Sequence, residues 1–143
     1  MAGTPGPDAE ARVRASFEKQ GLMALIGARL VEVERGRVRI DLPRRPEVSQ
    51  QHGYVHAGAT SAIADSAGGY AGLTMMPEGA EVLTVEYKLN LMAPAAGDLE
   101  AEGTVLRSGR TLTVCELAVF AVVGEQRTQV AAGMQTLICL PGN

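Results

Sequence analysis

One carboxylate stands apart in this sequence. Asp65 is the only charged residue in residues 57–77, an apolar stretch long enough to form a helix. Gly68, Gly69 and Gly72 follow it, although each glycine inside a helix costs about 1 kcal/mol relative to alanine. Close approach of a ligand or of another backbone would explain that cost. We therefore predict that Asp65 is functional; the alternative is a carboxylate on a water-facing side of the helix.

The start of the same helix is a second chemical site. Backbone N–H groups in the first turn have no intrahelical acceptor, and with the helix dipole they can polarise a carbonyl or hold an oxyanion. Ala57 and Gly58 stand there with little side chain to block an approach. Asp65 lies about 12 Å beyond Ala57 at 1.5 Å per residue, so one small group cannot touch both in one subunit. If both act on one carbonyl, Asp65 must come from a second copy of the chain, which predicts a dimer with shared sites.

A turn and a helix must position these groups. Residues 50–59 are predicted to be a turn, because glycines punctuate a polar stretch. Residues 60–76 are predicted to be a helix with apolar residues at i+3 and i+4. Its apolar stripe contains Ala59, Ile63, Ala67, Tyr70 and Leu73. The opposite stripe contains Ser61, Asp65, Gly68 and Gly72.

Short elements surround this helix. A helix is predicted over 9–20, followed by an apolar patch over 22–26 that packs on the domain. A hairpin follows, turning at Arg35–Gly36. Its strands are 28–34 and 37–42, with inward candidates Val31, Val33, Val38 and Ile40.

Four further strands complete the chain. They are predicted over 82–92, 99–106, 111–123 and 126–140. In the first of them, alternation places Leu83, Val85, Tyr87, Leu89 and Leu91 on one face. In the second, the water-facing residues are Asp98, Glu100, Glu102 and Thr104. Short turns predict an antiparallel meander of all four strands. Such a sheet buries its apolar face by wrapping the helix.

Composition narrows the class of protein. The chain has 143 residues, which is one domain's worth, and 46% of them are hydrophobic. Residues 1–8 are expected to be disordered and 9–143 to form a single domain. A net charge of −3 without a basic block disfavours nucleic-acid and anionic-membrane binding. We expect no membrane span and no signal peptide.

The cysteines and histidines argue against metal chemistry. Cys115 and Cys139 lack Cys-x-x-Cys spacing, so we predict free thiols in a reducing cytoplasm. His52 and His56 alone make a poor metal site, so no metal is expected.

Residues 50–65 resemble the signature of PaaI-like hotdog-fold acyl-CoA thioesterases. That pattern is Asn or Gln, x, x, Gly, x, x, His-Gly-Gly, with Asp or Glu seven residues after the last glycine. This sequence matches it with Gln50, Gly53, His56, Gly58 and Asp65, and departs from it at Ala57, where the family usually has glycine. Alanine keeps the N–H, but its methyl narrows the approach and a positive φ there would be disfavoured.

The resemblance covers roughly residues 20–140 and implies an α+β hotdog fold. In that fold an antiparallel sheet of about six strands wraps one long central helix, here with a short N-terminal helix. It also implies an acyl-CoA thioesterase that acts as a homodimer, with dimers often pairing into a homotetramer. Coenzyme A is then part of the substrate, and no cofactor is implied.

The resemblance assigns roles to the motif residues. The Ala57 N–H would meet the thioester carbonyl, and Asp65 of the partner subunit would act as general base or as nucleophile through an anhydride. Gln50 matches the family amide that orients water or carboxylate, unless it is a surface loop residue and Gln51 substitutes for it. His56 would hydrogen-bond near the carbonyl, or have a purely structural bond.

The remaining candidates concern substrate binding. Gly53 and Gly58 are expected to shape the backbone. Arg107 and Arg110 flank a turn glycine, where guanidinium groups could meet the phosphates of coenzyme A. Family members have a similar basic turn; ordinary solvation is the alternative.

Two other functions remain open from the sequence: a non-catalytic acyl-CoA-binding hotdog module, which the Ala57 departure favours, and a hotdog hydratase, whose motif is absent. The acyl group would be aryl or medium-chain, with Tyr54, Tyr70, Phe120 and the methionines as possible lining residues.

Overall fold

The computed structural model describes residues 6–142. The elements, in chain order, are α1 (Pro7–Glu18), α2 (Gly21–Ile26), β1 (Arg29–Glu34), β2 (Arg37–Leu42), the 3-10 helix η1 (Pro46–Val48), α3 (Ala57–Leu73), β3 (Glu81–Leu91), β4 (Asp98–Ser108), β5 (Leu112–Val123) and β6 (Gln126–Leu140). Most of the segment predicted to be disordered, residues 1–5, lies outside the described residues. Its end begins α1, because a proline in the first turn and the acidic Asp8 beside the positive end of the dipole both favour a helix start.

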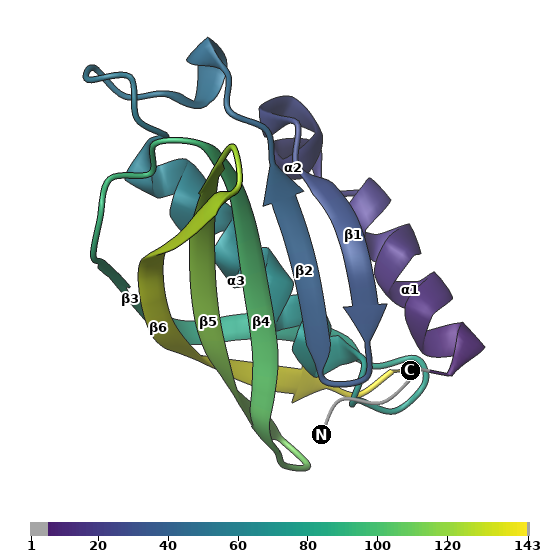
Figure 1. The fold of residues 1–143 in the computed structure, drawn as a ribbon. Coiled ribbons are helices and arrows are strands. Elements are labelled where there is room, and N and C mark those ends of the chain that lie inside the picture. Colours follow the sequence, from purple (N-terminus) through teal and green to yellow (C-terminus); the bar gives the residue numbers. More distant parts are fainter. Residues whose placement is uncertain (1–5, 143) are drawn as a thin grey trace.

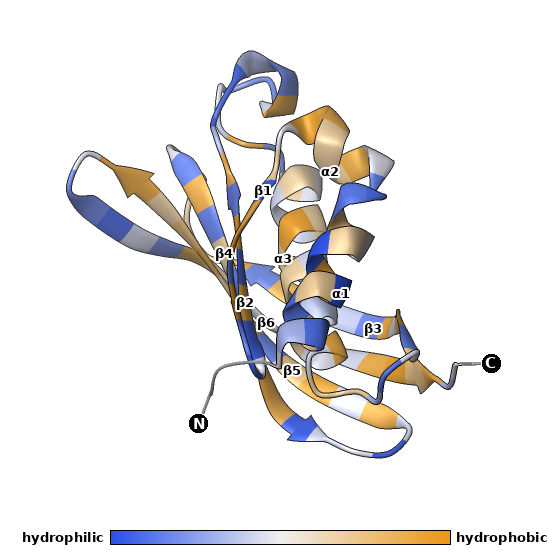
Figure 2. Cartoon of the chain, turned by 90° about the vertical axis from the view of Figure 1, so that its right-hand side faces the viewer, coloured by the Kyte–Doolittle hydropathy of each residue, from blue (hydrophilic) through white to orange (hydrophobic). Residues whose placement is uncertain are grey.

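One curled sheet holds the fold together. Its strand order is β1-β2-β4-β5-β6-β3, and every neighbouring pair is antiparallel. The sheet curls around α3 (Figure 1), and α1 lies on the same side of the sheet as α3 (Figure 2). This confirms the predicted hotdog arrangement of a six-stranded antiparallel sheet, one long helix and a short N-terminal helix. No helix within residues 6–142 is long and apolar enough to cross a membrane.

The predicted meander is wrong for β3. This strand pairs with β6, from Glu81 opposite Leu140 to Leu91 opposite Ala131, and forms an edge of the sheet. Only a tight hairpin turn forces consecutive strands together. Residues 92–97 are a longer connection, so the chain passes from β3 to β4, which pairs instead with β2 and β5.

Two bulges reverse predicted side-chain directions. The register of β1 shifts between Leu30 and Glu32, and Val31, predicted to be inward, is 38% exposed. The register of β3 shifts between Thr84 and Glu86, which places Thr84 on the side of α3. A single bulge breaks the period-2 alternation on which both predictions relied. Leu83 therefore does not share one face with Tyr87, Leu89 and Leu91, as alternation had predicted.

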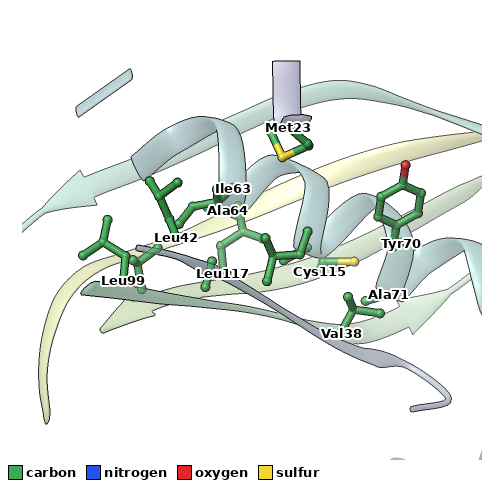
Figure 3. Packing of buried hydrophobic residues seen from close by; sticks show 14 of the residues in the cluster. Met23, Val38, Leu42, Ile63, Ala64, Tyr70, Ala71, Leu99, Cys115 and Leu117 are labelled. Carbon is green, nitrogen blue, oxygen red and sulfur yellow. The ribbon is translucent and has the colours of Figure 1, made fainter. Parts of the chain in front are cut away.

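The central helix is buried on more than one side. Ile63, Ala67, Tyr70 and Leu73 belong to the core, as predicted, and Figure 3 shows how several core residues of α3 and the sheet pack. Gly68 and Gly72 are also buried, so the predicted opposite stripe does not face water. A Cβ on Gly68 would overlap the side chains of Gln135 and Leu117, and one on Gly72 would overlap Leu137. These two glycines let α3 approach the sheet closely.

An ionic network covers the outer face of the sheet, with charged members on β1, β2, β4 and β6. Its members are Arg37, Arg39, Arg127, Glu32, Asp41, Glu100 and Glu102. The Arg127 guanidinium also lies 3.6 Å from the centre of the Phe120 ring. Phe120 therefore packs in this network and does not line an acyl pocket of the same chain. The predicted water-facing Glu100 and Glu102 take part in this network.

Candidate active site

Asp65 is held by two side chains from the sheet. It is half-buried on α3, and its Oδ1 accepts hydrogen bonds from Thr84 Oγ1 and Gln135 Nε2, both at 2.7 Å. The same amide group of Gln135 donates to the Asp65 main-chain oxygen at 3.0 Å. Oδ2 accepts no hydrogen bond from any residue in 6–142. The carboxylate is therefore oriented through one oxygen, and the other stays available.

Gln135 and Thr84 were not found by sequence reasoning. Gln135 is only 1% exposed, and apart from its neighbour Thr136 it is the only polar residue between Val130 and Leu140 of β6. That isolation, matching the isolation of Asp65, is the signal that could have found it. Gly68 is the second signal, because the space that its missing side chain leaves is filled by the Gln135 amide.

A pocket of about 320 Å³ lies beside Asp65. Its apolar lining includes Leu73, Val82 and Leu83; its polar lining includes Ser16, Gln20, Ser66 and Tyr70. Gly69 borders it, and a Cβ there would meet nothing within 4 Å. Gly68 and Gly72 thus allow the sheet to approach α3 closely, whereas Gly69 has open space beside the pocket, and the predicted approach of a ligand there stays a prediction.

The start of α3 presents one unused N–H group. His56 is the N-cap, and its Nδ1 accepts the Gly58 N–H at 2.7 Å. The Ala57 N–H has no acceptor within residues 6–142. None of the described non-glycine residues has a positive φ, so the Ala57 methyl causes no backbone strain. His56 therefore makes the structural hydrogen bond that was the alternative to a bond near the substrate carbonyl. The Ala57 N–H remains available as a donor.

The loop before α3 is built around Gln50. Its Oε1 accepts the backbone N–H groups of His52 and Tyr54, whereas its Nε2 has no acceptor in the part of the chain that the structure describes. Gly53 has a φ of 84°, which explains glycine there, and its carbonyl accepts from Arg44 at 2.7 Å. Gln50 thus stabilises its own loop and presents a free amide N–H₂.

A second pocket, of about 390 Å³, lies at this helix start. Its lining includes Gln50, Gln51, His56 and Ala57. The other lining residues include Tyr54, Thr60, Val130 and several residues between 91 and 95. It shares no lining residue with the Asp65 pocket. One chain therefore brings together Gln50, His56 and Ala57 but keeps Asp65 separate from them.

The two predicted phosphate-binding arginines lie elsewhere. Arg107 is the next-to-last residue of β4, and Arg110 lies in the β4–β5 turn. Both are exposed, and neither makes a hydrogen bond or ion pair with the described residues. Neither lines the pocket at Asp65 or the pocket at Ala57.

The thiols are not candidates for nucleophiles at these pockets. Cys115 and Cys139 are free, and burial raises the pKa of the Cys115 thiol to about 12. Its Sγ lies 3.5 Å from the Gly68 carbonyl oxygen in the core. A buried thiol that stays protonated is a poor nucleophile.

The sequence is similar to those of known thioesterases and esterases. The model of a family described as the thioesterase superfamily matches residues 52–127. A putative esterase of Halobacterium salinarum is 29% identical over 141 residues, covering 93% of each chain. The proofreading thioesterase EntH of Klebsiella pneumoniae is 28% identical over 117 residues, covering 81% of this chain and 85% of the relative.

Solved structures show the same fold. A thioesterase family protein from Silicibacter pomeroyi has a TM-score of 0.91 and 39% identity, over 94% of this chain and 99% of the other. The PaaI protein of E. coli has a TM-score of 0.83 at 18% identity, over 95% and 96% of the two chains, and so supports the fold alone.

Proposed function

The chain belongs to the thioesterase superfamily and is a thioester hydrolase, and from this premise we propose that it hydrolyses an acyl-CoA thioester to the free acid and coenzyme A. The observation that carries the proposal is the pair of available groups on α3. These are the carboxylate of Asp65, oriented through Oδ1, and the N–H of Ala57; neither Oδ2 nor this N–H has a hydrogen-bond partner among residues 6–142. One can activate water and the other can polarise a carbonyl.

In the general-base route, Oδ2 of Asp65 removes a proton from water as the water oxygen bonds to the thioester carbon. The carbonyl oxygen gains negative charge, which the Ala57 N–H and the positive end of α3 stabilise. The C–S bond then breaks, and the leaving thiolate takes the proton from Asp65. In the nucleophilic route, Oδ2 attacks the carbon first, the thiolate leaves, and water hydrolyses the resulting anhydride.

Gln50 and His56 support the helix start in this proposal. The free Nε2 of Gln50 lies in the wall of the Ala57 pocket and can donate to the substrate or to water. His56 holds the Gly58 N–H, which fixes the first turn of α3. Gly53 and Gly58 shape this backbone without contributing a chemical group.

The complete site requires a second copy of the chain. Ala57 and Asp65 line different pockets and are about 12 Å apart along the axis of α3. The edge strand β3 offers a surface for association, because an exposed apolar edge favours pairing. Its exposed apolar residues are Leu83, Val85, Tyr87 and Leu91. A two-fold dimer through this edge would give two sites, each using Ala57 of one subunit and Asp65 of the partner subunit.

The remaining parts of the proposal follow from the same chemistry. Arg107 and Arg110 would reach the phosphates of coenzyme A bound at the partner's helix start, since neither lies near the helix start of its own chain. Water, Asp65 and backbone N–H groups suffice for the reaction, so we propose that it needs no metal and no cofactor. A cytoplasmic location is proposed on the two free thiols.

Thiol release from a panel of acyl-CoA substrates tests the function. The panel contains phenylacetyl-, benzoyl- and medium-chain acyl-CoA, and a thiol reagent measures free coenzyme A. We expect release with at least one member. Measurable binding without release from any member would replace the enzyme by a non-catalytic binding module. Ala57 has no positive φ, which supports the enzyme over that module, although its methyl still narrows the approach to the N–H.

A further inference from the structure

His56 caps the central helix through a ring nitrogen that can accept a hydrogen bond only while it carries no proton. This Nδ1 accepts the Gly58 N–H at 2.7 Å, and the His56 main-chain oxygen accepts the Ala59 and Thr60 N–H groups at 2.9 and 3.0 Å. A neutral imidazole that accepts at Nδ1 has its proton on Nε2, whereas the charged imidazolium has a proton on both nitrogens. The side-chain bond to Gly58 therefore exists only in the neutral form of His56.

Histidine is an uncommon residue for this position. Asn, Asp, Ser and Thr are the side chains preferred before a helix, and none of them loses its acceptor near neutral pH. Gly58 is fitted to the imidazole, because a Cβ there would lie 3.0 Å from Nδ1 and 3.2 Å from Cε1 of the ring. His56 and Gly58 thus form one unit, in which the glycine leaves room for a cap that can gain a proton.

Little else stabilises the first turn of α3. The turn consists of Ala57, Gly58, Ala59 and Thr60, so it has no acidic residue to interact with the positive end of the helix dipole, and its glycine lowers the helix propensity. The Ala57 N–H, which the proposed function places on the substrate carbonyl, belongs to this turn. When His56 gains a proton, Gly58 loses its acceptor, and the new positive charge lies at the helix end that disfavours cations. Both effects loosen the turn that holds the Ala57 N–H in place.

We propose that His56 is a pH-dependent positioning residue, which holds the first turn of α3 in its active geometry at neutral pH and releases it in mild acid. The inference rests on the proposed thioesterase function and adds the regulation of the same site. The contribution of the cap is present while the imidazole is neutral. It is lost as pH falls through the range in which histidine side chains gain a proton, from about pH 8 to about pH 5.

Three other ionisable groups can face His56. Glu47 of η1 lines one of the two pockets that His56 borders, a pocket of about 270 Å³, and Tyr54 lines the other. The Glu47 carboxylate favours the charged imidazole, although the guanidinium of Arg45 lies 3.9 Å from that carboxylate and partly offsets its charge. In the proposed dimer, Asp65 of the partner subunit also comes to this helix start. The experiment must therefore separate protonation of His56 from protonation of a carboxylate.

The test compares side chains that do and do not lose their acceptor in acid. His56→Asn keeps an acceptor, because Oδ1 of asparagine is bonded to the same branch atom as Nδ1 of histidine and gains no proton in this range. For each protein, kcat on the best substrate of the acyl-CoA panel at about pH 7.5 is divided by kcat at about pH 5.5. We expect a wild-type ratio of about 5, the fold-change that corresponds to the typical loss of a helix cap, and a ratio near one for His56→Asn. His52→Asn is the matched control and should retain the wild-type ratio, because His52 is exposed and lines neither pocket.

A second measurement needs no substrate. The nuclear magnetic resonance signal of the Gly58 amide reports the cap directly, and in the wild type it should titrate together with the His56 ring. In His56→Asn the same signal should stay constant over this pH range. Circular dichroism at both pH values checks the fold, and His56→Ser, another common cap, serves if His56→Asn does not fold.

Three results would overturn the inference. A wild-type ratio near one would show that acid does not act on the site through His56. A wild-type ratio retained in folded His56→Asn would assign the loss to another group, such as Asp65. A Gly58 signal that stays constant while His56 titrates would show that the first turn does not depend on the cap. If no member of the panel is hydrolysed, the proposed function is wrong, whereas the Gly58 signal still decides whether acid opens the cap.

Discussion

The Gln135 amide nitrogen lies 2.7 Å from Oδ1 of Asp65 and 3.0 Å from the main-chain oxygen of the same residue. One side chain of β6 therefore fixes the carboxylate and the local backbone of α3 together. Gly68 makes this contact possible, because a side chain there would overlap the amide. Asp65 and Gly68 thus belong to one structural unit with Gln135, which lies 70 positions after Asp65 in the sequence.

Asp65→Asn should preserve the fold and remove the base. The amide has nearly the shape of the carboxylate but cannot accept a proton from water, so we expect kcat to fall by at least about 10²-fold. Thiol release at saturating acyl-CoA measures it. Asp8→Asn, the same chemical change at the exposed start of α1, is the control and should retain activity. Near-normal turnover in folded Asp65→Asn would refute the role.

Gly68→Ala should destabilise the protein and lower turnover together. The new methyl must displace the Gln135 amide and the Leu117 side chain, and overpacking of this kind costs about 1–3 kcal/mol. Gly69→Ala is the stability control: its methyl enters open space, and we expect a gain of about 0.4–1 kcal/mol. Denaturant unfolding measures the stability of both variants. Equal stability of the two variants would show that the helix–sheet spacing is more tolerant than described.

Ala57→Gly should maintain or improve kcat. Glycine keeps the N–H and removes a methyl from the edge of the pocket at the helix start. Because Ala57 has no positive φ, the gain should come only from the wider approach, and stability should fall by up to about 1 kcal/mol. Steady-state kinetics and thermal unfolding measure the two effects. A large fall in kcat at unchanged stability would mean that the chain is adapted to alanine at this position.

Mixed dimers should recover activity that each parent lacks. A chain with Asp65→Asn lacks the carboxylate, and a chain with Ala57→Pro lacks the polarising N–H. Each homodimer should be inactive, whereas a mixed dimer has one site with both defects and one site with neither. Activity is measured after subunit exchange, with sedimentation as the check on assembly. An active monomer, or fully exchanged dimers without recovery, would contradict shared sites.

The ionic network on the sheet should make the stability of the fold depend on pH. The hydrogen bond from Arg37 holds the pKa of Glu32 below its ordinary value of 4.5, although partial burial opposes this. A carboxylate with a lowered folded-state pKa stabilises the fold above its unfolded-state pKa, and this contribution is lost as pH falls through the folded-state value. Glu32→Gln should therefore lower Tm at pH 7, and its difference from the wild type should shrink as pH drops below 4.5. Glu125→Gln, in an exposed turn, should show no such change.

What the sequence determined by itself is local. The period of apolar residues over 60–76 predicted the central helix, because side chains three and four apart share a face whatever surrounds them. In the structure this helix begins and ends three residues earlier, at Ala57–Leu73. Tight turns such as Arg35–Gly36 predicted the hairpin of β1 and β2, and the spacing from Gln50 to Asp65 predicted the family. The fixed rise of a helix also separates Ala57 from Asp65, however the rest of the chain packs around it.

Only the tertiary structure decided which distant segments meet. β3 pairs with β6 rather than with its neighbour β4, and a bulge turns Thr84 toward Asp65; neither follows from a period-2 pattern. Gln135 reaches the carboxylate because Gly68 leaves room, which is a property of the helix and the sheet packed together. Such contacts depend on long-range pairing and on the fit of two surfaces, whereas sequence periodicity reports only which side of its own element a residue occupies.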